Sequence, residues 1–173
     1  SKPDCFALVS IFIACLQNSK RVGNYPQVVV NLRVRQQHIK PASATNNARY
    51  QTAEAAGLSI DQVRGLKLKW AFGFDGDVTA FAQPTVIDGQ VFVGSAGGVI
   101  HALRADTGCL QWTFQAAGPV RSALVVVPLG RRHALLFGDQ TGFFYAVEAE
   151  TGTLLWKKKI ETHDAARLTG APV

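Results

Sequence analysis

Short runs of alternating apolar and polar residues, separated by glycine-containing turns, follow one another through the second half of the chain. A period of two is typical of half-buried β-strands, because successive side chains of a strand point to opposite faces of its sheet. The pair Asp88-Gly89, between two such runs, is a strong hairpin signal. The runs predict strands at residues 66–74, 85–87, 91–94, 99–103, 110–114, 124–127, 134–137, 143–147 and 154–158. The pattern therefore predicts an all-β fold.

One unit of this pattern occurs twice. Residues 98–112 and 142–156 carry Ala, Thr-Gly and Trp at matching positions, 44 residues apart. A further tryptophan, Trp70, lies 42 residues before Trp112. Periods of about 40–50 residues with a fixed glycine turn and an aromatic residue are typical of propeller blades. Each unit predicts a four-stranded antiparallel meander, and stacking covers the apolar faces that one sheet cannot bury alone.

Two units do not close a ring. Propellers close with about four to eight blades, so the chain predicts two blades of a larger ring of about eight. Residues 168–173 match the start of a third unit.

The turns and aromatic residues of the units predict how neighbours meet. Gly108 follows Thr107 in a turn that needs a positive φ, and Trp112 is expected to lie across the neighbouring sheet rather than to form a cofactor platform. His101 is expected to be a packed or surface strand residue rather than a ligand. The segment 128–133 predicts a longer turn in the second unit, and a short helix is expected at 60–64.

The N-terminal part of the chain has a different character. Residues 1–45 are predicted to form an atypical N-terminal segment, for which a degraded export signal, a linker and a disordered stretch are the alternatives. Residues 46–173 are predicted to form a partial propeller. The apolar run at 7–16 is too short to span a membrane, for which a helix needs about 20 residues. It permits export without requiring it, and we expect no stable membrane span.

Charge and motifs exclude several functions. The net charge is +6, but residues 1–45 carry six Lys and Arg against one Asp, whereas residues 46–173 carry twelve against eleven acidic residues. The repeats are thus close to neutral, and no nucleic-acid partner is expected. The chain contains neither a C-x-x-C zinc pattern nor a C-x-x-C-H haem attachment signature.

The repeated motif A-x-x-x-[DE]-T-G-x-x-x-W, at 102–112 and 146–156, resembles the blade motif of pyrroloquinoline quinone (PQQ) propellers. Non-enzymatic propellers share that motif, but the flanks narrow the resemblance. Residues 47–51 and 62–72 are similar to the opening segment of quinoprotein alcohol dehydrogenases, and 82–94 to their first full blade. The sequence of residues 74–108 resembles the polyvinyl alcohol dehydrogenase branch of this family.

The resemblance implies a cofactor site near the ring axis, at the starts of successive innermost strands. PQQ carries several carboxylates, so an arginine is expected there. Arg121 stands where the methanol-oxidising type has its carboxylate-binding arginine, and the resemblance makes Arg121, Ser122 and Thr169 the expected PQQ contacts. The methanol type has an acidic residue at Phe81 and a cysteine pair at Gln115-Ala116, so this chain departs from it. Catalytic residues and calcium ligands are expected after residue 173.

For function, the resemblance implies a PQQ-dependent enzyme that oxidises alcohols, with polyvinyl alcohol as a candidate substrate. Electrons would pass to a cytochrome c, calcium would accompany PQQ, and the enzyme would work in the periplasm. Two alternatives stay open. One is a non-catalytic scaffold of the outer-membrane assembly type, and the other is a sensor or sugar-binding propeller.

Overall fold

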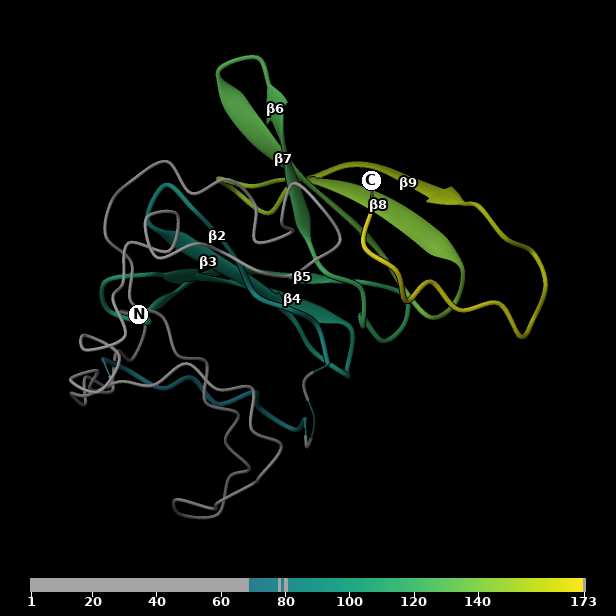
Figure 1. Cartoon of the computed structure of the whole chain (residues 1–173), viewed down its shortest axis with the longest axis horizontal. Coiled ribbons are helices and arrows are strands. Elements are labelled where there is room, and N and C mark those ends of the chain that lie inside the picture. Colours follow the sequence, from purple (N-terminus) through teal and green to yellow (C-terminus); the bar gives the residue numbers. More distant parts are fainter. Residues whose placement is uncertain (1–68, 78, 80, 173) are drawn as a thin grey trace, which may run out of the picture.

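The computed structural model describes residues 69–172 except 78 and 80. The predicted N-terminal segment, the helix at 60–64 and the opening segment at 47–51 lie outside these residues. Eight strands are present in the described part, and they form two four-stranded antiparallel sheets (Figure 1). The all-β prediction is confirmed.

The first sheet, unit 1, contains β2 (Thr85–Ile87), β3 (Gln90–Gly94), β4 (Val99–Arg104) and β5 (Leu110–Gln115) in that order. The second sheet, unit 2, contains β6 (Val125–Leu129), β7 (Arg132–Gly138), β8 (Phe143–Glu148) and β9 (Leu154–Lys159). Within each sheet, every strand therefore pairs with its neighbour in sequence, as expected for a meander. The ladders of the two units match in detail, since each shows a register shift in its third strand, at Ala102/Leu103 and at Ala146/Val147.

Tight turns with positive φ join the strands. Asp88 and Gly89 have φ angles of 46° and 77°, as a two-residue hairpin turn of type I′ requires. Gly108 and Gly152 have φ angles of 73° and 75° in the matching turns between the last two strands of each unit. The predicted hairpin turn at Asp88-Gly89 and the predicted positive φ of the glycine in the Thr-Gly turn are confirmed.

The prediction of a longer turn at residues 128–133 is wrong. β6 and β7 continue through this region, where Pro128 pairs with His133 and Leu129 with Arg132, so that only Gly130 and Arg131 form the turn. Proline has no N–H to donate, but β6 is the edge strand of its sheet, where that loss is tolerated. The presence of Pro128 led to the prediction of a longer turn, because the local pattern does not show that this residue lies in an edge strand.

The strand predicted at 66–74 is not confirmed in its described part, because residues 69–74 are not in a ladder. A strand needs a paired neighbour, and no described strand runs beside this segment. Its side chains nevertheless pack on unit 1 as strand residues would. Trp70 lies with Val91, Leu103 and Ala105 in a buried cluster.

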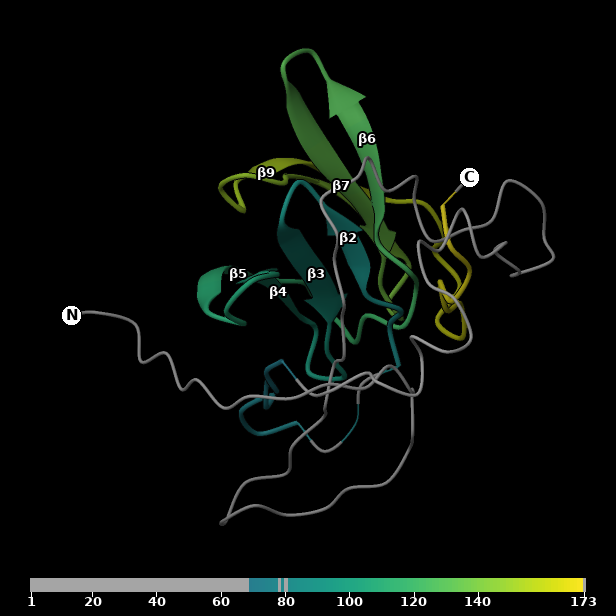
Figure 2. The same ribbon diagram turned by 60° about the vertical axis from the view of Figure 1, so that its left-hand side comes forward.

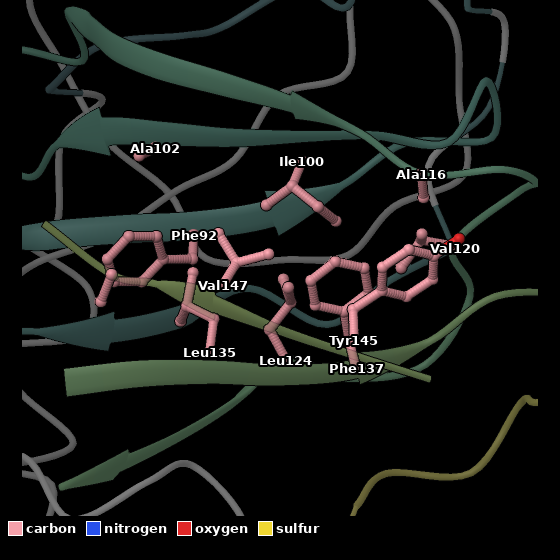
Figure 3. Packing of buried hydrophobic residues seen from close by; sticks show 11 residues of the cluster. Phe92, Ile100, Ala102, Ala116, Val120, Leu124, Leu135, Phe137, Tyr145 and Val147 are labelled. Carbon is pink, nitrogen blue, oxygen red and sulfur yellow. The ribbon is translucent and has the colours of Figure 1, made fainter. Parts of the chain in front are cut away.

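The main core lies between the two sheets (Figure 3). Phe137 and Tyr145 of unit 2 stack with ring centroids 5.0 Å apart, and Phe114 of unit 1 meets Tyr145 edge-on at 5.8 Å. The innermost strands β2 and β6 are neighbours, and the Thr85 hydroxyl donates to the Leu124 carbonyl over 2.5 Å. Figure 2 shows the two sheets from the side on which β2 and β6 lie together. Stacking of the units, predicted from their apolar faces, is therefore what forms the core.

A tryptophan of each segment packs on the Thr-Gly turn of the next unit. The indole N–H of Trp70 donates to the Ala105 carbonyl over 3.1 Å, and that of Trp112 to the Ala149 carbonyl over 3.0 Å. A Cβ on Gly152 would lie 2.7 Å from Trp112. Glycine is therefore required twice at this turn, for its φ and for the space that the indole occupies. The third tryptophan, Trp156, is 46% exposed.

Candidate cofactor-binding site

The predicted site residues lie at one end of the sheets, which we call the entry end because β2 and β6 begin there. Just before β6, Val120 packs on Gly94 of β3, where an added Cβ would lie 2.8 Å from its side chain. Leu168 packs in the same way on Gly138 of β7, at 2.7 Å. The backbone N–H of Val120 donates to the Ser95 carbonyl just after β3, and that of Leu168 to the Asp139 carbonyl just after β7, each over 3.2 Å. The two segments are therefore structurally equivalent.

Arg121 and Thr169 follow these two packed residues and occupy equivalent positions. Phe81 belongs to the same series, because Ala82 contacts the Gly94 position as Ser122 contacts Gly138. Three successive segments thus bring one exposed residue each to the entry end. That this repeated position binds a cofactor stays a prediction.

Arg121 is an exposed cation without a hydrogen-bonding partner among the described residues. Its guanidinium carbon lies 4.2 Å from the centroid of the Phe81 ring. No ion pair or hydrogen bond joins Arg121 to another residue of the described part. A guanidinium carries five N–H donors in a planar fork that suits carboxylates. Arg121 is therefore chemically suited to bind a carboxylate at this end.

Ser122 lies beside Arg121 but faces inward. Its side chain is fully buried, its hydroxyl donates to the Gly138 carbonyl over 3.0 Å, and it accepts from the Gly138 N–H over 3.2 Å. The hydroxyl hydrogen is therefore already paired within the protein. A contact of Ser122 with a cofactor stays a prediction, and its two hydrogen bonds hold the segment before β6 to β7.

Thr169 is exposed, and its hydroxyl has no hydrogen-bonding partner in the described part of the chain. It follows Leu168, whose packing fixes the backbone at this point. The structure thus brings Thr169 to the same end of the molecule as Arg121, as the sequence predicts.

A buried carboxylate near this end was missed by the sequence reasoning. Asp139 follows β7, and its Oδ1 accepts from the backbone N–H groups of Thr141 and Phe143 and from the Thr141 hydroxyl. Its Oδ2 accepts from the Tyr145 hydroxyl over 2.7 Å, and that hydroxyl accepts from the Ala117 N–H over 2.9 Å. The Asp-x-Thr-Gly pattern at 139–142 is the available signal, since Asp side chains bind their own backbone in turns.

Electrostatics match this geometry. Burial opposes the charge of Asp139, but the hydrogen bonds from Tyr145, Phe143 and Thr141 outweigh it and hold the pKa below its usual value. Burial and the bond to Asp139 raise the pKa of Tyr145. Asp139 is therefore charged at neutral pH, and both of its carboxylate oxygens accept hydrogen bonds within the protein. It holds the turn that follows β7, and its backbone carbonyl accepts from the Leu168 N–H.

A groove of about 830 Å³ lies at the opposite end of the sheets, between the turns of units 1 and 2. Its charged residues have mixed sign: Lys69, Asp88, Arg104, Asp106, Arg131, His133 and Glu150. Several are paired with each other, as Arg104 is with Asp106 and His133 with Glu150. The groove is therefore separate from the Arg121 site, and its charges are largely satisfied.

Among the described residues, no group of three or more His, Cys, Asp or Glu side chains is arranged to hold a metal ion. In that same part of the chain, no helix has the length and apolar character needed to cross a membrane.

Comparison with known proteins agrees with the repeat pattern. The PQQ_2 family, described as "Outer membrane protein assembly factor BamB", matches residues 36–173. Polyvinylalcohol dehydrogenase of Pseudomonas sp. is 39% identical over 130 residues, which cover 73% of this chain and 20% of that protein. The enzyme of the same name from Sphingopyxis sp. (strain 113P3) is 37% identical over 130 residues, 73% of this chain and 19% of the relative.

Among solved structures, quinohemoprotein alcohol dehydrogenase from Comamonas testosteroni is similar to this chain, with 24% sequence identity and a TM-score of 0.45. The match covers 54% of this chain and 15% of that protein. The chain belongs to the family of PQQ-type β-propellers, with polyvinylalcohol dehydrogenases and quinoprotein alcohol dehydrogenases among its relatives. It spans about a fifth of the length of the curated relatives it matches. Units 1 and 2 are two blades of this fold.

Proposed function

We propose that the full-length protein containing this chain is a PQQ-dependent alcohol dehydrogenase, and that Arg121 binds a carboxylate of the cofactor. One observation carries the proposal. Among the described residues, the Arg121 guanidinium has no ion pair or hydrogen bond, and it lies at the end of the sheets where successive innermost strands begin. The two polyvinylalcohol dehydrogenase relatives each match 73% of the chain.

The residues present fit PQQ by their chemistry. A guanidinium fork can hold a carboxylate through two parallel hydrogen bonds, and Thr169 adds a hydroxyl that can donate or accept. The bound cofactor would supply the electron-accepting chemistry for alcohol oxidation. The described residues would hold it in orientation, since none of them is placed as a proton-transferring group beside Arg121.

Further parts of the proposal concern the complete protein. The names of two relatives support polyvinyl alcohol as the substrate class. Another relative is named "1-butanol dehydrogenase (cytochrome c)", which supports a cytochrome c as electron acceptor. Calcium beside PQQ and a periplasmic location follow from the family resemblance, and metal analysis and cell fractionation of the full-length protein test them.

The test is PQQ affinity of the full-length protein, measured by titration calorimetry with calcium present. Arg121→Ala should weaken binding by about 2–4 kcal/mol, because a partly desolvated charge-assisted pair is lost. Arg121→Lys should recover only part, because an ammonium cannot reproduce the fork. Arg131→Ala, an exposed arginine at the opposite end, is the matched control and should bind as wild type does.

The competing function is a non-catalytic scaffold of the BamB type, which the family description favours. A scaffold would bind PQQ with equal, weak affinity in the wild type and in Arg121→Ala. That result would remove the enzyme proposal and leave Arg121 as a rim residue.

A further inference from the structure

Phe81 is an unusual residue for its position. It is 44% exposed, although a phenylalanine side chain gains free energy when it is buried. It belongs to neither of the two buried clusters, and among the described residues its ring contact is with Arg121. Packing of the core therefore does not explain an aromatic residue here.

The contact joins equivalent positions of neighbouring units. Ala82 and Ser122 occupy matching places against Gly94 and Gly138, so the residues just before them, Phe81 and Arg121, are matching as well. The guanidinium carbon lies 4.2 Å from the ring centroid, within the range of a cation–π interaction. The repeat itself places the ring beside the cation.

An aromatic neighbour has a chemical advantage over an acidic one. A carboxylate at this position would pair with the guanidinium and compete with any ligand for its N–H donors. A phenyl ring attracts the cation through its face and accepts none of those hydrogen bonds in full strength. The ring can thus restrict the long arginine side chain while its donors stay available.

We propose that Phe81 is a positioning residue, which holds the Arg121 guanidinium in place for a ligand carboxylate. This inference rests on the proposed function, because Arg121 must bind the cofactor for its position to matter. Pre-organisation of a flexible side chain reduces the entropy lost on binding, and the effect should appear in cofactor affinity.

The experiment is a double-mutant cycle on PQQ affinity in the full-length protein, by titration calorimetry. Phe81→Leu should weaken binding about three- to tenfold, whereas Phe81→Tyr, which keeps the aromatic face, should stay within about twofold of wild type. In the Arg121→Gln background, Phe81→Leu should have no further effect, because the cation that it positions is gone. Leu129→Ala, an exposed apolar residue at the opposite end, is the control and should leave affinity unchanged.

The outcomes separate the two proposals. If Arg121→Gln binds PQQ as wild type does, both the site and the role of Phe81 are overturned. If Arg121→Gln weakens binding but Phe81→Leu does not, the site stands and the positioning role is overturned. Equal losses from Phe81→Leu in both backgrounds would also overturn it, since Phe81 would then act independently of Arg121. Thermal unfolding midpoints of all variants identify any that lose affinity through misfolding.

Discussion

The guanidinium of Arg121 and the imidazole of His101 have opposite environments. Arg121 is exposed and keeps its donors unpaired among the described residues. His101 is 8% exposed, its Nδ1 has no hydrogen-bonding partner in the described part, and its ring meets Phe72 and Phe74 at 5.2 Å and 5.0 Å. One residue is therefore available to a ligand, whereas the other is a packing residue, one of the two placements that the sequence predicts for it.

His101 should make stability depend on pH. Burial lowers its pKa below 6.5, and the charge of Asp77 offsets this only in part. Well above pH 6.5 neither the folded nor the unfolded state binds this proton, so His101 contributes no pH dependence there. As pH falls below 6.5 the unfolded state takes up the proton first, and the free energy of unfolding falls by at most about 1.4 kcal/mol per pH unit.

The variant that tests this is His101→Phe, which keeps an aromatic ring beside Phe72 and Phe74. Thermal unfolding midpoints of the full-length protein at pH 7.5 and 5.5 should fall less in the variant than in the wild type. A loss of equal size in both would show that other groups govern the acid sensitivity.

At the scale of elements, most strand positions could be predicted because their signals are local. Alternation and turn glycines lie within a few residues of each other, and the strands of unit 1 match their predicted ranges within one residue at each end. The errors arose where a partner far away in the chain decides. Pro128 continues β6 because that strand is at an edge, and residues 69–74 pack on unit 1 without pairing with a described strand.

The packing of a tryptophan on a glycine turn is the element-level contact that repeats, and it can be tested at Gly152. Gly152→Ala should be strained by its φ of 75° and by contact with Trp112 at 2.7 Å. Gly130→Ala is the matched control, because its φ is 61° but no atom lies within 4 Å. Gly130→Ala should cost about 1–2 kcal/mol, and Gly152→Ala about 1–3 kcal/mol more.

Denaturant unfolding of the full-length protein, followed by tryptophan fluorescence, measures both variants. The fluorescence of Trp112 should change only with Gly152→Ala. Equal destabilisation by the two substitutions would mean that the indole can move away at no cost.

At the scale of the whole molecule, unit 2 has an outer face that no described residue covers. Leu155, Trp156 and Ile160 on or beside β9 are 39%, 46% and 51% exposed. The equivalent tryptophans Trp70 and Trp112 are packed on the next unit's turn. Exposed apolar faces of this kind lead to association, so the 173-residue chain alone should self-associate.

Light scattering coupled to size-exclusion chromatography of this chain measures the association. Trp156→Lys should shift it toward monomer, whereas Thr162→Lys, with the same added charge away from the sheet, should not. A monomeric wild-type chain would show that the face is stable in water.

The chain alone should also bind PQQ weakly, since it supplies only some of the strand starts around a ring axis.

The candidate site was predicted only in part. The resemblance placed Arg121 and Thr169, and both lie at the entry end of the sheets. Neither the Phe81 contact with Arg121 nor the Asp139–Tyr145 hydrogen bond could be predicted. These pairs depend on how neighbouring strands or units stack, and nothing in the local pattern states which side chains will meet.

Most strands, the Asp88-Gly89 and Thr-Gly turns and the repeated unit follow from the chain alone, because alternation, glycine and a period of 44 residues are properties of short stretches or of their recurrence. The chain alone does not show which tryptophan meets which turn, that Ser122 is buried while Arg121 is exposed, or that Phe81 lies beside the cation. These outcomes depend on contacts between units, and such contacts exist only once two sheets have stacked.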